Sequence, residues 1–137
     1  MSILEENIIR QLPTEDKSLD YRATNNSLFS SLDKTCIVID DDPTGNQTVY
    51  DIPLLTNWDI QTLVDEFKKR TPTFFLLTNS RSLSASQSKA IYAQIAQNIL
   101  AASKLVNRDF TLISRSDSTL RGHFFEIETL KLEVGEN

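Results

Sequence analysis

The chain has 137 residues, of which 39 % are hydrophobic and 24 % charged, and its formal net charge is -5 at pH 7. This composition indicates one soluble globular domain with its own core rather than a disordered chain. The acidic balance argues against broad binding to nucleic-acid phosphates, which requires a basic face.

Other global features narrow the class of protein further. No apolar run approaches the roughly 18 to 20 residues of a membrane span, and the N-terminus lacks a basic region followed by an apolar block. We therefore expect no membrane partner and a cytoplasmic location. One histidine and one cysteine cannot make a zinc site, and Cys36 is predicted to fill core space in a buried strand.

The predicted elements alternate between strands and helices along the chain. Residues 1–34 are polar and are predicted to form an N-terminal helical extension. After it, β-branched or aromatic runs predict strands, and apolar residues three and four apart predict helices. In chain order these are a strand at 35–40, an extended segment at 47–56, a helix at 59–70, a strand at 73–78, a helix from Ser84 to about Lys104, a strand at 110–114 and a helix from about Gly122 to Leu132.

This order predicts an α/β fold, three-layer with a mainly parallel sheet, in which only the first three strand-helix units are present. Asn57 or Asp59 is expected to cap the helix at 59–70, and Ser84 the next helix. All three predicted strands end in polar residues, DDDPTG, TNSR and SRSDST. Because the carboxyl ends of parallel strands share one edge of a sheet, these residues are predicted to form a single site.

The first strand end carries three adjacent carboxylates, Asp40, Asp41 and Asp42. Such a cluster can bind magnesium, accept hydrogen bonds from a polyol, or remove a proton from a hydroxyl. The alternative is structural, with Asp40 as the end of the strand and Asp42 as the opening residue of a turn before Pro43.

The other two strand ends carry cations and hydroxyls. Arg81 is placed to hold a substrate carboxylate through two parallel hydrogen bonds, although a lone arginine is more often a surface charge. The stretch 114–123, SRSDSTLRGH, can cap the following helix and bind an anion at its free amide groups. His123 is either a switch near neutral pH or a structural residue.

Three motifs in this order resemble the N-terminal domain of the four-carbon acid sugar kinases. They are IDDDPTGNQTV at 39–49, TNSR at 78–81 and SRSDSTLRGH at 114–123. Weaker similarity extends from Gln11 to about Glu128, so the resemblance covers most of the chain. Residues 35–137 are therefore expected to be a partial, truncated copy of that domain, which continues in the family with further strands and helices.

The resemblance implies a kinase that uses ATP and Mg²⁺ to phosphorylate the terminal hydroxyl of four-carbon sugar acids such as threonate, erythronate or 3-oxo-tetronate. In that family the N-terminal domain holds the sugar acid and a separate C-terminal domain holds the nucleotide. This chain has no G-x-x-x-x-G-K-[ST] loop. We therefore expect it to bind no cofactor or metal alone, to be inactive by itself, and to have the missing nucleotide-binding domain as its partner.

Carried over residue by residue, the motifs imply the members of the site. Asp41 and Asp42 would be catalytic and would face the sugar hydroxyls, and the resemblance leaves open which of them is the base. The rest of the substrate pocket would comprise Arg81, Arg115, Ser116, Asp117, Ser118 and Arg121.

Two other functions remain open from the residues. Asp40, Asp42 and Thr44 spell D-x-D-x-T after a buried strand, the nucleophile motif of haloacid dehalogenase-like phosphatases, with Thr78 as a possible second motif. Against this, the stretch 114–123 has no place in a phosphatase of that kind. The remaining possibility is a non-catalytic remnant that binds a small acid or a partner's domain.

Overall fold

The computed structural model describes residues 9–14, 20–47, 49–117, 123 and 125–135. The chain divides into two compact units, Met1–Ser31 and Leu32–Asn137. In the first unit, helix α2 spans Arg22–Ser31 and has no buried residue. The predicted polar extension, 1–34, includes this unit. The second unit contains the sheet and the helices that pack against it.

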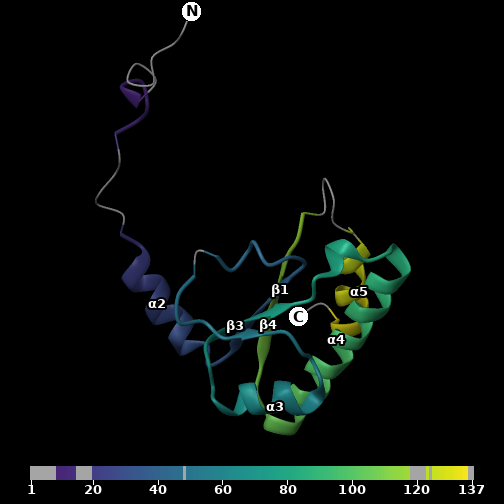
Figure 1. Cartoon of the computed structure of the whole chain (residues 1–137). Helices are drawn as coiled ribbons and strands as arrows, with labels where there is room; N and C mark the ends of the chain where they lie inside the picture. The colour runs from purple at the N-terminus through teal and green to yellow at the C-terminus, as the bar shows by residue number, and fades with distance from the viewer. Residues whose placement is uncertain (1–8, 15–19, 48, 118–122, 124, 136–137) are drawn as a thin grey trace, which may run out of the picture. The chain divides into compact units, whose positions relative to one another are not determined.

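The sheet of the second unit has four parallel strands in the order β2-β3-β1-β4 (Figure 1). Their bounds are β1 Thr35–Asp40, β2 Leu54–Leu55, β3 Thr73–Leu77 and β4 Phe110–Arg115. The predicted α/β fold with a parallel sheet is therefore confirmed. The short β2 lies within the segment that was predicted only as extended, and it becomes a strand because its two leucines pair with Phe75 and Leu76 of β3.

The central strand β1 is buried along its whole length, as its continuous apolar run predicts. It pairs with β3 on one side and β4 on the other, and Asp40 at its end lies opposite Leu77 and Arg115. The three strand ends that carry the polar motifs therefore lie next to one another. This is the arrangement that the sequence predicts for a shared site.

The helices of the second unit pack against one face of the sheet (Figure 1). They are α3 Ile60–Lys68, α4 Ala85–Val106 and α5 Phe125–Val134, with a short 3-10 helix η1 at Ser80–Ser82. Their apolar side chains form the main core with Ile37, Ile39, Phe74 and Leu76. On the other face Cys36, Val38 and Phe75 pack with Val49 and Ile52 of the β1–β2 connection. These layers are consistent with the predicted three-layer fold.

Cys36 is a buried residue of the second face, as predicted. Burial raises the pKa of its thiol, which keeps it in the unreactive protonated form. This cysteine is therefore a small core residue.

The two predicted helix caps are present. Asp59 accepts a hydrogen bond from the Thr62 amide at the start of α3. At the start of α4, Ser84 and Gln87 form a reciprocal capping box, in which each side chain accepts from the other residue's amide. The start of α4 is fixed by this box, and Tyr92 of α4 contacts Ser80, the neighbour of Arg81.

We predict that Ser84→Ala lowers the free energy of unfolding by about 1 kcal/mol, because the first turn of α4 loses its hydroxyl acceptor. Thermal or denaturant unfolding of the purified chain measures the loss. Lys89→Ala, an exposed change one turn later in the same helix, should alter stability by no more than about 0.5 kcal/mol. Equal effects of the two changes would contradict a specific capping role.

Candidate functional site

Backbone hydrogen bonds fix the three strand ends to one another. The amide of Thr78 donates to the carbonyl of Asp40 at 2.9 Å, and the amide of Arg81 donates to the carbonyl of Asp41 at 3.3 Å. On the other side, the amide of Asp41 donates to the carbonyl of Arg115 at 3.3 Å. The acid loop, Asp40 to Asp42, is therefore held between the ends of β3 and β4.

Arg81 holds the acid loop through a bidentate ion pair. Its Nε and Nη2 donate to the two carboxylate oxygens of Asp41 at 3.1 and 2.8 Å, and its Nη1 also pairs with Asp42. The side chain of Asp41 is fully buried, whereas that of Arg81 is 17 % exposed. One face of the Arg81 side chain therefore remains open to solvent.

Arg115 approaches the acid loop from β4. Its Nη1 lies 3.3 Å from Asp40 Oδ1 and 3.4 Å from Asp42 Oδ1. The amide of Asp117 donates to Asp41 Oδ2 at 3.3 Å. The two guanidinium groups thus offset the mutual repulsion of the three adjacent carboxylates.

One oxygen from each carboxylate of the acid loop lies within 4.8 Å of the other two, a spacing that a divalent cation could use. Five of the six carboxylate oxygens, however, already accept from Arg81, Arg115, Thr44 or the Asp117 amide. The sixth, Asp40 Oδ2, is buried without a hydrogen-bond partner. The three carboxylates are therefore arranged to bind arginine rather than Mg²⁺, and we assign no metal to them.

Gly45 closes the acid loop over Asp40. A Cβ atom built at Gly45 would lie 1.9 Å from Asp40 Oδ2 and 2.8 Å from Arg115 Nε. Only glycine lets the backbone approach the carboxylate this closely. The close approach also leaves no room for a ligand at Asp40 Oδ2.

The carboxylates at the two ends of the acid loop differ in their protonation. Burial raises the pKa of Asp40 above its ordinary value of 3.8, although Arg115 opposes this shift. Asp42 has the reverse behaviour, because the Thr44 hydroxyl, which donates to Asp42 Oδ1, lowers the pKa of that carboxyl. Asp42 is therefore the group that stays ionised to lower pH.

We predict that a ¹³C-detected titration of the side-chain carboxyls shows Asp42 titrating below pH 3.8 and Asp40 above it. Since the native state keeps the Asp40 proton after the unfolded chain has lost it, Asp40 contributes less stability as pH rises through its folded pKa. The Asp42 contribution is instead lost as pH falls through its folded pKa.

In the same titration, Arg115→Ala should raise the pKa of Asp40 further, because it removes the main factor that lowers it. Arg70→Ala is the control and should leave both carboxyls unchanged, because this exposed arginine precedes β3 and so lies at the opposite edge of the sheet from Asp40. Reversed titration order, or an Asp40 pKa insensitive to Arg115→Ala, would contradict the charge arrangement described here.

A polar hollow with a volume of about 380 Å³ opens in front of the acid loop. It is lined by Thr44, Arg81, Arg115, Ser116 and Asp117. Two guanidinium groups, hydroxyls and a carboxylate thus border one space, a combination that suits a ligand with both an anionic group and hydroxyls. Oxyacids of small sugars have this chemistry.

The structure brings together most of the predicted site residues. Some of them line the hollow, and the others lie behind it in the acid loop. Arg81, Arg115, Ser116 and Asp117 line the hollow. Asp41 is buried behind Arg81, and Asp42 is 8 % exposed. The predicted members Ser118 and Arg121 lie outside the described residues, as does Gly122, the expected start of the last helix.

Two members of the site, Thr44 and Gly45, were not predicted from the sequence. Thr44, considered only in the phosphatase alternative, donates from its amide to Asp42 at 2.8 Å and lines the hollow, and Gly45 covers Asp40. The signal for Thr44 was the Asp-Pro-Thr sequence, since an aspartate commonly accepts from the amide two residues later. His123, left open above, donates from Nε2 to the Leu83 carbonyl at 3.0 Å.

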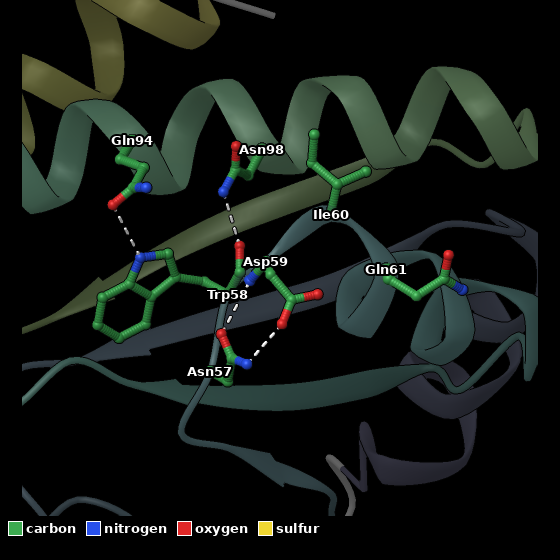
Figure 2. A pocket seen from close by; sticks show the side chains of 7 residues that line it. All are labelled: Asn57, Trp58, Asp59, Ile60, Gln61, Gln94 and Asn98. Atoms are coloured by element: carbon green, nitrogen blue, oxygen red, sulfur yellow. Dashed lines mark hydrogen bonds between the residues drawn. The ribbon is translucent and has the colours of Figure 1, made fainter.

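A larger hollow of about 470 Å³ lies elsewhere, around Trp58 at the start of α3. Figure 2 shows Gln94 and Asn98 pointing from α4 toward this segment, where the Trp58 indole donates to Gln94 and Asn98 donates to the Trp58 carbonyl. Asn57 and Asp59 are hydrogen-bonded to each other. The polar groups around this hollow mainly form hydrogen bonds with one another, and these bonds connect the start of α3 to α4. The smaller, charged hollow is therefore the better ligand site.

The chain matches a family of known proteins. Residues 36–136 match the family described as sugar-binding N-terminal domain. The chain therefore belongs to this family, which is the N-terminal domain of the four-carbon acid sugar kinases, and the resemblance seen in the motifs is confirmed. Its ligand class is a sugar. No curated protein and no solved structure matches the chain.

Within the residues that the structure describes, no helix combines the length and the apolar character needed to cross a bilayer.

Proposed function

We propose that this chain is the sugar-acid-binding part of an ATP-dependent kinase that phosphorylates the terminal hydroxyl of four-carbon acid sugars of the threonate, erythronate or 3-oxo-tetronate type. The observation that carries the proposal is the hollow bordered by Arg81 and Arg115 in front of a buried acid loop. Family membership supports a sugar as the ligand. We prefer an acid sugar over a neutral one because the two guanidinium groups can bind a carboxylate.

The substrate carboxylate would lie against the open sides of Arg81 and Arg115. The hydroxyls would then meet Thr44, Ser116 and Asp117 on the remaining walls of the hollow. An arginine that is already oriented by Asp41 and Asp42 loses little conformational freedom when it binds an anion. This preorganisation favours a small ligand, which offers few contacts.

Of the two predicted catalytic residues, Asp42 is our candidate for contact with the substrate hydroxyl, and Asp41, buried behind Arg81, would orient that arginine. Asp42 has a lowered pKa and is ionised at neutral pH, so it can accept a hydrogen bond from a substrate hydroxyl and orient it. Such a weak base suits phosphoryl transfer, which depends mainly on positioning and on screening of phosphate charge. Mg²⁺ and ATP would be supplied with a separate nucleotide-binding domain, the proposed partner, and this chain alone would not turn over.

The phosphatase alternative is not favoured by the geometry. Asp40, which would be its nucleophile, is fully buried, and Gly45 lies directly over its free oxygen. The Thr78 hydroxyl donates to the Asp40 carbonyl at 3.0 Å, so it faces the backbone rather than a phosphate position. A phosphoryl group could not reach Asp40 without rebuilding the loop.

Isothermal titration calorimetry with the purified chain tests the proposal. We expect threonate or erythronate to bind, and the matched neutral polyols threitol and erythritol to bind about 100-fold more weakly, because they lack the carboxylate. A full-length relative with these motifs should release ADP with the same acids, whereas the chain alone should not. Equal binding of acids and polyols, or no binding of either, would refute the assignment. Binding without ADP release from the full-length relative would point to a non-catalytic role.

A further inference from the structure

A line of buried polar side chains runs from the acid loop into the helical layer. The Thr78 hydroxyl lies 3.0 Å from the Asp40 carbonyl, to which it donates, and 3.1 Å from Ser80 Oγ. The Ser80 hydroxyl donates in turn to the Tyr92 hydroxyl on α4 at 3.5 Å. Ser80 and Tyr92 are both fully buried. The acid loop is thus joined to the middle of the core through hydroxyl groups.

The line continues from α4 to α5. The Ser88 hydroxyl donates to Glu126 Oε1, and the same carboxylate lies close enough to Tyr92 to raise the pKa of that phenol, behind the larger effect of burial. We call Thr78, Ser80, Ser88, Tyr92 and Glu126 the polar link. Its five members are buried, and they come from β3's end, η1, α4 and α5.

A second contact ties the same two regions. His123, just before α5, donates to the carbonyl of Leu83, which is the C-cap of η1. The amide of Glu126 donates to the carbonyl of His123 at 3.0 Å. The η1 turn, which contains Arg81, is therefore held on its inner side by the polar link and at its end by His123.

The polar link is not an arrangement that core stability alone would favour. Glu126 is fully buried, and its Oε2 has no hydrogen-bond partner. Leaving a buried carboxylate oxygen unpaired is unfavourable, and a leucine of similar size would avoid it. The hydrogen bonds of the polar link, however, have directional geometry that apolar packing does not.

We propose that Tyr92 and Glu126 are positioning residues for the sugar-acid site, which act by holding η1 so that Arg81 keeps its bidentate geometry on Asp41. Neither residue touches the hollow, so their effect passes through Ser80, the neighbour of Arg81. This inference rests on the proposed function for its ligand. The orientation of Arg81 itself can be measured without any ligand.

The test combines two measurements on the full chain. Hydrogen exchange of the Arg81 Nε–H, followed by NMR with ¹⁵N-labelled arginine, reports the ion pair with Asp41 directly. Calorimetry with threonate or erythronate reports the affinity. We expect Tyr92→Phe and Glu126→Leu each to speed the exchange and weaken binding by about tenfold, the effect of losing one buried hydrogen-bond partner. Glu126→Gln keeps an acceptor for Ser88 and should stay within about threefold of the parent chain.

Ile99→Val is the matched control, because it removes a buried methyl group from the same helix without touching the polar link. It should lower thermal stability while leaving both the Arg81 exchange and the affinity unchanged. If Ile99→Val changes them as much as Tyr92→Phe does, or if Tyr92→Phe and Glu126→Leu leave the exchange unchanged, the inference is wrong. If the parent chain binds no sugar acid, the proposed function fails while the exchange measurement still decides the inference.

Discussion

Arg81→Ala is expected to weaken sugar-acid binding by about 100-fold, as truncation of a buried, hydrogen-bonded charge pair commonly does. The change removes the cation that we place against the substrate carboxylate. It also leaves Asp41 buried with only the Asp117 amide donating to its side chain among the contacts described. The loss should therefore appear in stability as well as in affinity.

The expected loss in the free energy of unfolding on Arg81→Ala follows from the burial of the ion pair. Removing one partner of a buried ion pair costs roughly 3 to 5 kcal/mol. We expect the lower end, about 3 kcal/mol, because the hollow would admit water to Asp41 once the guanidinium is gone. Denaturant unfolding, alongside calorimetry with threonate or erythronate, separates the two effects.

Two control variants sharpen the Arg81 experiment. Arg81→Lys keeps the charge but loses the planar fork that meets both oxygens of Asp41, and it should weaken binding by about tenfold. Arg70→Ala removes an exposed arginine whose partner, Asp33, is also exposed, and it should leave binding unchanged. Equal affinity of Arg81→Ala and the parent chain would remove Arg81 from the site.

Gly45→Ala is expected to abolish measurable sugar-acid binding through a single added methyl group. The new Cβ would overlap Asp40 Oδ2 at 1.9 Å and press on Arg115 Nε at 2.8 Å. The acid loop cannot keep its path, because Asp40 is fully buried and has little space to withdraw. Overpacking of this kind typically costs about 1 to 3 kcal/mol.

Gly135→Ala provides the comparison for Gly45. Gly135 has a φ of +84 and nothing within 4 Å of an added Cβ, so substitution there meets backbone strain without a clash. It should cost about 1 kcal/mol in stability and leave sugar-acid binding intact. Calorimetry and thermal unfolding of both variants test the contrast, and retained binding in Gly45→Ala would show that the loop can rearrange.

Much of the fold could be predicted from the sequence because its signals are local. Ser84 and Asp59 cap the helices that they were expected to cap, and the apolar run of β1 is buried as its pattern indicates. The strand β2 was predicted only as part of an extended segment, because two leucines carry no periodicity of their own. Their pairing with β3 exists only in the folded sheet.

The site could be predicted at the level of its location. The parallel order placed Arg81 and Arg115 at the same edge as the acid loop, but no pattern shows that Arg81 pairs with Asp41 while Arg115 bridges Asp40 and Asp42. Those pairings depend on side-chain reach. The role of Tyr92 could not be predicted either, because a tyrosine on the apolar face of a helix has the pattern of an ordinary core residue.

The pairing of Asp40 with Arg115 across β1 and β4 means that the site also helps to select the correct alignment of the sheet. Shifting β4 by one residue would turn Arg115 to the opposite face and place a serine beside Asp40, since neighbouring residues of a strand point to opposite sides. The misaligned chain would bury the Asp40 carboxylate without its cation. Charge matching at the ligand site thus discriminates against misregistered β-structure during folding.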